Sequence, residues 1–273
     1  MEKRFPGCSL ASFCAKLVLP IALNTGEGNS LLIGMPLRIL SIAGVAECVF
    51  IRRENRFVGL ARCGGRDTRV HINNTGRLLD LLFPGAEVLC IEIDSPRTPL
   101  RVVGTKVDGD RWTLIDTKLQ ERVFILSVEG GYIPWLAGYR VVRRDLDLGG
   151  LKIDFLLRSP HSGREALVEL KSAVYYHPSD RSARYPDTIS LRGRRHIEAL
   201  INSSGYERYL VFIAGHPEAE IFGPSSIDPI LPGLLKRALE AGVLIKAIKI
   251  YIDGRSVVLS NPDLPTTLEP PLI

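Results

Sequence analysis

The stretch ALVELK, residues 166–171, places two charged side chains in an otherwise apolar run. Successive side chains alternate faces along a strand, so Glu169 and Lys171 share one face and their apolar neighbours occupy the other. A preceding apolar run, 151–157, carries Asp154 in the same way. If these two strands pair, one acid from each and a lysine meet at one point of a sheet.

This combination of side chains suits a divalent cation. Carboxylates hold hard ions such as Mg2+ or Mn2+, and such an ion polarises a phosphoryl oxygen and lowers the pKa of bound water. The lysine could orient that water or stabilise charge on the phosphate. Asp145, in the run Arg-Arg-Asp-Leu-Asp at 143–147, could add a carboxylate. The predicted catalytic residues are Asp154, Glu169, Lys171 and Asp145, with Asp154, Glu169 and Asp145 as metal ligands.

A plainer interpretation competes with this one. Glu169 and Lys171 could form a solvated salt bridge, worth well under about 1 kcal/mol, and Asp145 would look the same in a surface loop. The apolar surroundings of Asp154 and Glu169 favour the site, because charges in largely buried strands require partners or a metal.

The rest of the C-terminal half predicts a mixed sheet with helices on its faces. Leu119, Val123 and Leu126 have helical spacing. The other expected elements alternate between strands and helices along the chain: strands at 139–144, 151–157, 166–174, 208–214 and 245–252, and helices at 187–203 and 228–241.

The N-terminal half is predicted to be β-rich. Alternating runs bounded by turn residues predict five strands, at 38–50, 56–63, 68–73, 87–94 and 100–107. A short helix is expected at 76–82, between the third and fourth strands and before Pro84-Gly85. Five strands with a helix at that place are the layout of an OB-fold barrel.

Basic residues gather at two places that could contact a polyanion. The candidates in the N-terminal half are Arg52, Arg53, Arg56, Asn74 and Arg77, and those in the C-terminal half are Arg192, Arg195 and His196. Solvated basic faces are the alternative, and His196 could equally be a packed or capping histidine. Aromatic residues are sparse in the predicted barrel, which favours phosphate contacts over base stacking.

Composition limits the class of protein. The chain has 273 residues, a formal net charge of +5, 45% hydrophobic and 24% charged residues, which excludes wholesale disorder and permits a nucleic-acid partner. No apolar run reaches the roughly 18 residues of a membrane span. Five cysteines without a CxxC pair predict no disulfide framework and favour a reducing, cytoplasmic location.

The expected domain scheme has four parts. Residues 1–36 are an unassigned extension, 37–110 the OB-like domain, 111–255 the sheet domain and 256–273 a Pro-rich tail. The start of the extension mimics a signal peptide, but Lys16 interrupts its apolar core and Pro20 breaks its helix. Met35 remains open as an alternative start.

Several motifs together resemble the sugar fermentation stimulation protein A family over about residues 45–253. They are Phe50 to Phe57, Val70 to Leu78 with Pro84-Gly85, Arg144-Asp145 through Phe155, Val168 to Lys171, Tyr185-Pro186-Asp187 with Arg192-Gly193 and His196, and Ile227-Asp228-Pro229. Asp145 stands where the family usually has Glu, and Lys152 replaces its usual Arg.

The resemblance implies an N-terminal all-β OB-fold-like barrel and an α/β C-terminal domain similar to the PD-(D/E)xK nuclease superfamily. Asp154, Glu169 and Lys171 match the catalytic positions of that superfamily. The implied function is nucleic-acid binding, to DNA rather than RNA, with a metal-dependent phosphodiesterase site that uses Mg2+ or Mn2+. The alternatives are a non-catalytic DNA-binding regulator of maltose metabolism and, with no sugar-site signature, a small-molecule protein. No membrane partner is expected, and a homodimer is left open.

Overall fold

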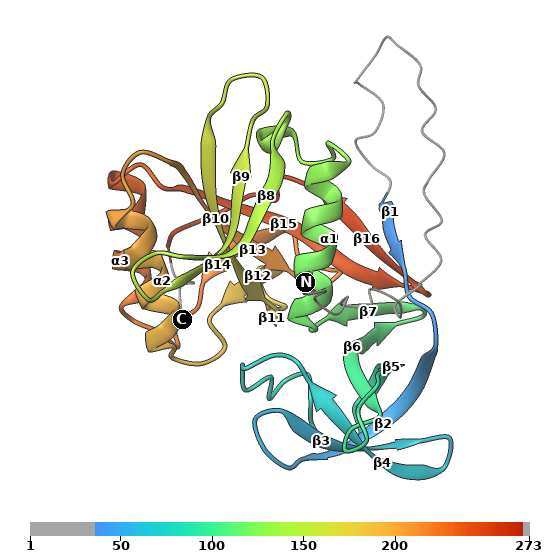
Figure 1. Cartoon of the computed structure of the whole chain (residues 1–273). Helices are drawn as coiled ribbons and strands as arrows, with labels where there is room; N and C mark the ends of the chain where they lie inside the picture. The colour runs from blue at the N-terminus through green and yellow to red at the C-terminus, as the bar shows by residue number, and fades with distance from the viewer. Residues whose placement is uncertain (1–35, 270–273) are drawn as a thin grey trace, which may run out of the picture.

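The structure of the chain is a computed structural model that describes residues 36–269. Its strands fall into one large twisted sheet and one small sheet (Figure 1). The large sheet contains β1 Leu37–Ser41, β2 Val45–Arg53, β3 Val58–Cys63, β4 Arg66–Ile72, β5 Glu87–Glu92, β6 Leu100–Asp108, β7 Arg111–Leu114, β8 Arg140–Asp147, β9 Lys152–Arg158, β10 Glu165–Ala173, β13 Glu207–Ala214, β15 Leu244–Asp253 and β16 Ser256–Asn261. The small sheet contains β11 Tyr175–His177, β12 Ser182–Tyr185 and β14 Ile221–Pro224.

The N-terminal strands form a closed barrel. Their order is β4-β3-β2-β5-β6, and a parallel pairing of β4 with β6 closes the ring. The barrel interior is apolar, with Phe50, Val70, Ile72, Val88 and Val102 at 0–1% exposure. This is the five-stranded OB arrangement that the strand pattern predicted.

The segment between β4 and β5 differs from its prediction. Residues 76–82 form turns and no helix. Leu78 adopts a left-handed backbone with φ of 53°, a conformation that an α-helix does not contain. Its amide N–H donates to the Asp187 carboxylate in the C-terminal half, so a tertiary contact replaces the helical hydrogen bond.

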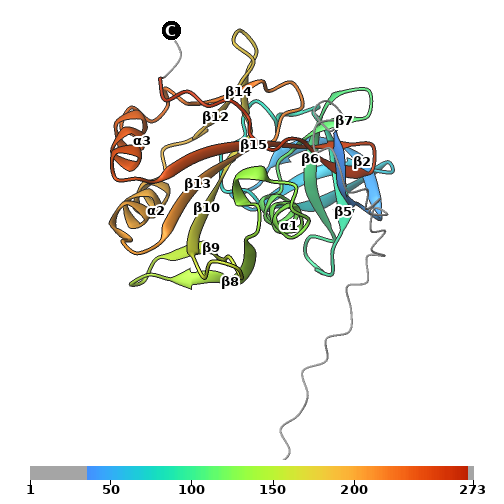
Figure 2. The ribbon, with the colours of Figure 1, turned by 90° about the horizontal axis from the view of Figure 1, so that it is seen from above.

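The C-terminal half is a three-layer arrangement. Helix α1, Thr117–Glu129, lies on one face of the strands, and α2, Leu191–Asn202, and α3, Leu231–Glu240, lie on the other (Figure 2). A short 3-10 helix spans Pro134–Leu136. Successive apolar side chains of β10 point to opposite faces and pack in different cores. Val168 packs in the α1 core and Leu167 in the α2–α3 core.

Strand pairing fixes the neighbours of the central strand β10. It runs parallel to β13, which runs parallel to β15, and antiparallel to β9, which pairs with the edge strand β8. Strand β7 joins this sheet to the barrel by pairing with both β6 and β15. The two halves therefore share one continuous sheet.

Two stretches have structural roles other than the predicted ones. Ser256–Asn261, expected in the tail, forms β16 and pairs with β15 and with β1. Leu37–Ser41, expected in the barrel, therefore belongs to the outer edge of the shared sheet. Residues 1–35, including Met35, lie outside the described residues. No helix within 36–269 has the length and apolarity to cross a bilayer.

The barrel also contains a disulfide that was not expected. Cys48 of β2 and Cys63 of β3 are register partners with Cα atoms 4.5 Å apart, and they form a disulfide. Cys90 is buried beside them as a free thiol. Residue spacing could not indicate this pair, because only the antiparallel register brings the two cysteines together.

Candidate acid–lysine site and basic cleft

Strands β9 and β10 separate where they carry their acids. Their backbone pairing runs from Glu165↔Arg158 to Val168↔Phe155. Beyond this pairing, side-chain carboxylates accept from the backbone in place of carbonyl groups. The Asp154 N–H donates to Glu169 Oε2 at 3.3 Å, and the Leu170 N–H donates to Asp154 Oδ2 at 2.7 Å. The two carboxylates therefore replace the next hydrogen bonds between the strands, and they are held side by side.

Glu169 is buried at 2% exposure and has partners on both oxygens. Lys171 Nζ donates to its Oε1, and His196 Nδ1 lies 2.5 Å from the same oxygen. Burial alone would raise the pKa of Glu169, but Lys171 and His196 outweigh it and hold that pKa below its ordinary value. Glu169 is therefore an ionised carboxylate with three protein donors, since the Asp154 N–H donates to its other oxygen.

The ring of His196 is oriented by α2. The side chain of Arg192 donates from Nε to His196 Nε2 at 3.3 Å. With Nε2 accepting, Nδ1 carries the proton and donates to Glu169. His196 itself is 4% exposed, so its position is that of a packed histidine that supports the acid.

Asp154 has a different electrostatic environment from Glu169. Burial and the adjacent charge of Glu169 raise the pKa of Asp154 to about 7, and Lys171 only partly opposes them. A second negative charge is therefore unfavourable here at neutral pH. A bound cation would relieve that repulsion, so the carboxyl pair fits a hard metal ion.

A third acid reaches the region from β8. Asp145 lies between Arg144 and Leu146, whose strand partners Phe155 and Ile153 flank Asp154. Asp145 has a left-handed backbone, with φ of 51°, and its side chain is exposed. The register therefore places Asp145 opposite Asp154 across the edge of the sheet.

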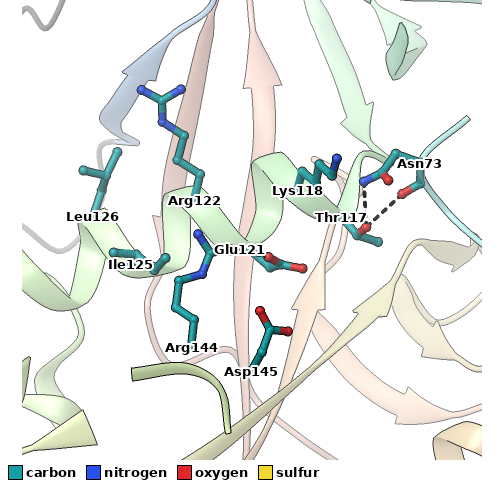
Figure 3. A pocket seen from close by; sticks show the side chains of 9 residues that line it. All are labelled: Asn73, Thr117, Lys118, Glu121, Arg122, Ile125, Leu126, Arg144 and Asp145. Carbon is teal, nitrogen blue, oxygen red and sulfur yellow. Dashed lines mark hydrogen bonds and ion pairs between the residues drawn. The ribbon is translucent and has the colours of Figure 1, made fainter. Parts of the chain in front are cut away.

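A cavity of about 680 Å³ opens between α1 and β8 (Figure 3). Glu121 from α1 and Asp145 point toward each other in it, and Arg144 forms an ion pair with Glu121 at 2.9 Å. Burial raises the pKa of Glu121, Arg144 opposes that rise, and Asp145 adds to it. Glu121 was not predicted from the sequence, because no periodic pattern shows that this helix face turns toward β8.

The acids do not form a compact ligand cluster. Within residues 36–269, the one group of three His, Cys, Asp or Glu ligand atoms all within 4.8 Å is Cys48, Cys63 and Cys90. Metal binding at the acids would therefore require side-chain adjustment. The acids still offer only oxygen ligands, which favour Mg2+, Mn2+ or Ca2+ over softer ions.

The predicted basic residues of α2 divide between two faces. Arg192 is exposed and contacts His196 beside the acids. Arg195 instead lines a separate cavity with Leu148 and Glu198. The structure therefore brings Arg192 and His196 together with Glu169 but not Arg195.

The predicted basic residues of the barrel also have separate roles. Arg53 donates to the carbonyls of Gly76, Arg77 and Arg56, so its guanidinium holds two loops together. Arg56 and Arg77 are exposed and line one cavity of about 500 Å³ with it. Arg52 is exposed beside Glu54, at 3.7 Å, and does not join that cavity.

Asn74 connects the barrel to the acid-bearing strand. Its side-chain amide donates to the Ile115 carbonyl at 3.0 Å and to Ser172 Oγ at 3.3 Å, one residue beyond Lys171. Its Oδ1 accepts from the Gly76 N–H. Asn74 is 8% exposed, which assigns it to the join between the two halves.

A second join lies close by. Asp187 Oδ2 accepts from the Leu78 N–H at 2.9 Å. A Cβ at Gly76 would lie 2.2 Å from the same carboxylate oxygen. Only glycine therefore allows this close approach of the barrel loop to the segment after β12.

Comparison with known proteins identifies relatives of both halves. Residues 51–115 match the family model described as the SfsA N-terminal OB domain, and residues 118–256 match the sugar fermentation stimulation protein RE domain. A sugar fermentation stimulation protein homolog of Pyrococcus furiosus is 37% identical over 231 residues, which cover 84% of this chain and 98% of that protein. A homolog of Pyrobaculum arsenaticum is 35% identical, over 81% of this chain and 94% of that protein.

A solved structure agrees with the fold. The structure of Pyrococcus furiosus SfsA in complex with Ca2+ matches with a TM-score of 0.80 and 34% identity, over 85% of this chain and 99% of that chain. The expected order of an OB barrel followed by an α/β domain is thus confirmed. The structure places Asp154 and the Glu169-x-Lys171 pair on adjacent strands.

Proposed function

This chain belongs to the sugar fermentation stimulation protein family, and we propose that it is a DNA-binding protein with a metal-dependent phosphodiesterase site. The observation that carries the proposal is the separation of β9 and β10, which holds the Asp154 and Glu169 carboxylates side by side with the Lys171 amine. Hydrolysis of a phosphodiester needs acids for a cation and a cationic group near the phosphate.

Several side chains would have separate roles in the proposed reaction. Lys171 supplies positive charge next to Glu169, where it can stabilise the charge that develops on a cleaved phosphate. His196 holds Glu169 in place, and Arg192 holds His196. Arg56 and Arg77 in the barrel cavity are free to contact phosphates of the bound strand.

A divalent cation would be held by Asp154 and Glu169, with Asp145 and Glu121 as further oxygen ligands from the edge of the sheet. When bound, the ion would polarise the phosphoryl oxygen and acidify a water. Two observations support the fit: the raised pKa of Asp154 beside an ionised Glu169, and the Ca2+ bound by the Pyrococcus furiosus relative. We propose Mg2+ or Mn2+ for catalysis.

The test is a cleavage assay with matched variants. Labelled single- and double-stranded DNA and RNA are incubated with the full chain and Mg2+ or Mn2+. Glu169→Gln should lower the cleavage rate at least about 100-fold, because one oxygen-ligand charge and the partner of Lys171 are lost. Glu165→Gln is the control, since Glu165 lies on the same strand and pairs with Arg158 at the surface. Equal cleavage by wild type and Glu169→Gln would show that Glu169 does not belong to the phosphodiesterase site.

A second candidate function rests on a specific feature of the site. Both oxygens of Glu169 are already engaged by protein donors, an arrangement that also suits an acid with a purely structural role. The alternative is therefore a non-catalytic DNA-binding protein that regulates sugar metabolism. Salt-dependent DNA binding without cleavage under any of the divalent ions would favour it.

Three further parts of the proposal concern context. DNA is favoured over RNA by the family resemblance, not by a recognised contact to the sugar. A cytoplasmic location and a homodimer both stay predictions, which fractionation of cells and sedimentation of the pure protein can test.

A further inference from the structure

A second cavity lies between the barrel and the C-terminal half, and the proposed function does not use it. Its volume is about 260 Å³. The barrel loop that carries Arg77 and Leu79 forms one wall, and Tyr175 and Tyr176 of β11 form another. His216 and Ile227 line it from two loops of the sheet domain, and the remaining lining residues are Leu78, Asp80, Leu81 and Asp187.

One wall of this cavity is an aromatic platform of two stacked rings. The rings of Tyr176 and His216 stack with centroids 3.9 Å apart and planes within 1° of parallel. Burial lowers the pKa of His216 to about 4, and its Nδ1 accepts from the Glu218 N–H. The His216 ring is therefore uncharged at neutral pH, and the platform offers flat π surface with a remaining ring N–H donor.

The barrel wall of the cavity combines charge with an exposed apolar side chain. Arg77 and Leu79 line both this cavity and the basic cavity that contains Arg53 and Arg56. Leu79 is 68% exposed, so its side chain is available to contact a ligand at this surface. The basic cavity, which could hold a nucleic-acid backbone, is thus adjacent to the cavity lined by aromatic rings. Leu79 lines both.

The cavity is also close along the chain to the acid–lysine site. Tyr175 begins β11 two residues after Ala173 ends β10, the strand of Glu169 and Lys171. The four residue steps from Lys171 to Tyr175 span at most about 13 Å when fully extended. A strand of nucleic acid whose phosphate reaches Lys171 can therefore place a nucleotide from the same short stretch at Tyr175.

We propose that this cavity takes one unstacked nucleobase of the bound DNA, with Tyr175 and the Tyr176–His216 pair as stacking surface and Leu79 as the wedge that fills the vacated stack. Proteins that extrude a base enclose it between aromatic and apolar side chains, and leucine is among the residues that insert between base steps. The inference rests on the proposed DNA binding and adds how the strand is engaged.

The test compares two DNA duplexes that differ in one base. Each carries a single-nucleotide bulge, with a normal base in one and an abasic analogue in the other. Binding to the full chain is measured by fluorescence anisotropy at low salt in Ca2+, with intact DNA verified on a gel. Stacking of one base is worth about 1–3 kcal/mol, so wild type should bind the base-bearing bulge about tenfold more tightly than the abasic one.

Variants distinguish base binding in the cavity from general DNA binding. Leu79→Ala and Tyr175→Ala should bring the affinity ratio of the two duplexes close to one, while circular dichroism shows that they remain folded. Leu239→Ala, an exposed leucine of α3, is the matched control and should keep the ratio of wild type.

The outcomes distinguish this inference from the proposed function. Equal affinity of wild type for both duplexes overturns the base cavity but leaves DNA binding and cleavage in place. A ratio that Leu79→Ala and Tyr175→Ala both leave unchanged also overturns the cavity. Failure to bind either duplex at low salt overturns both proposals together.

Discussion

Asp154 provides a test that needs no substrate, because its raised pKa links the stability of the metal-free protein to pH. Its pKa is 3.8 in an ordinary environment and about 7 in the fold. A carboxyl whose folded pKa lies above its unfolded pKa contributes stability that is complete below about pH 4. That stability is lost as pH rises through about 7. Asp154→Asn removes the ionisation and keeps an oxygen that can accept from the Leu170 N–H.

The size of the effect follows from these two pKa values. The raised pKa lowers the free energy of unfolding of the wild type, relative to its value at low pH, by about 2 kcal/mol at pH 5 and by about 4 kcal/mol at pH 8. The stability of Asp154→Asn relative to wild type should therefore improve by about 2–3 kcal/mol between pH 5 and pH 8. The sign of this change depends only on the raised pKa.

Urea unfolding in the presence of a chelator measures this difference at each pH. The variant Asp110→Asn is the control, since Asp110 is exposed in the turn between β6 and β7, and its effect should be the same at both pH values. An equal effect of Asp154→Asn on stability at pH 5 and pH 8 would show that the fold does not raise the pKa of Asp154.

Three further predictions concern the joins and the barrel. Gly76→Ala should destabilise the protein by about 2 kcal/mol or more in urea, because its Cβ meets the Asp187 carboxylate; Gly233→Ala, with open space around it, should not. Arg194→Ala should destabilise the protein in the same measurement, since the buried Asp228 loses its ion pair. Unchanged stability would contradict a contribution of that pair. Reduction of the barrel disulfide, which spans 15 residues, should lower the free energy of unfolding by about 2–3 kcal/mol. An unchanged melting curve in reductant would show that the bond does not form.

The sequence was informative wherever one strand or helix carried the signal. Alternation located the strands of the barrel and of the sheet, and the same alternation placed Glu169 and Lys171 on one face. The family resemblance added the superfamily of the C-terminal domain, and the comparisons confirm the family. These features depend on local pattern, which a single sequence contains.

Features that depend on register or on packing between elements could not be predicted in this way. Glu121 joins the acids only because α1 packs beside β8. Leu78 leaves the helical region because a residue more than 100 positions away accepts its N–H. Arg53 looked like a phosphate ligand, but its guanidinium is occupied by backbone carbonyls. In each case the deciding partner is distant in the sequence.

Asp154 and Glu169 are proposed to share one divalent cation. Crystals of the chain soaked in Mn2+ and measured for anomalous scattering would locate that ion. We expect one strong peak within ligand distance of oxygens from both Asp154 and Glu169. Density showing Glu169 still bonded to Lys171 and His196, with no ion at Asp154, would contradict it.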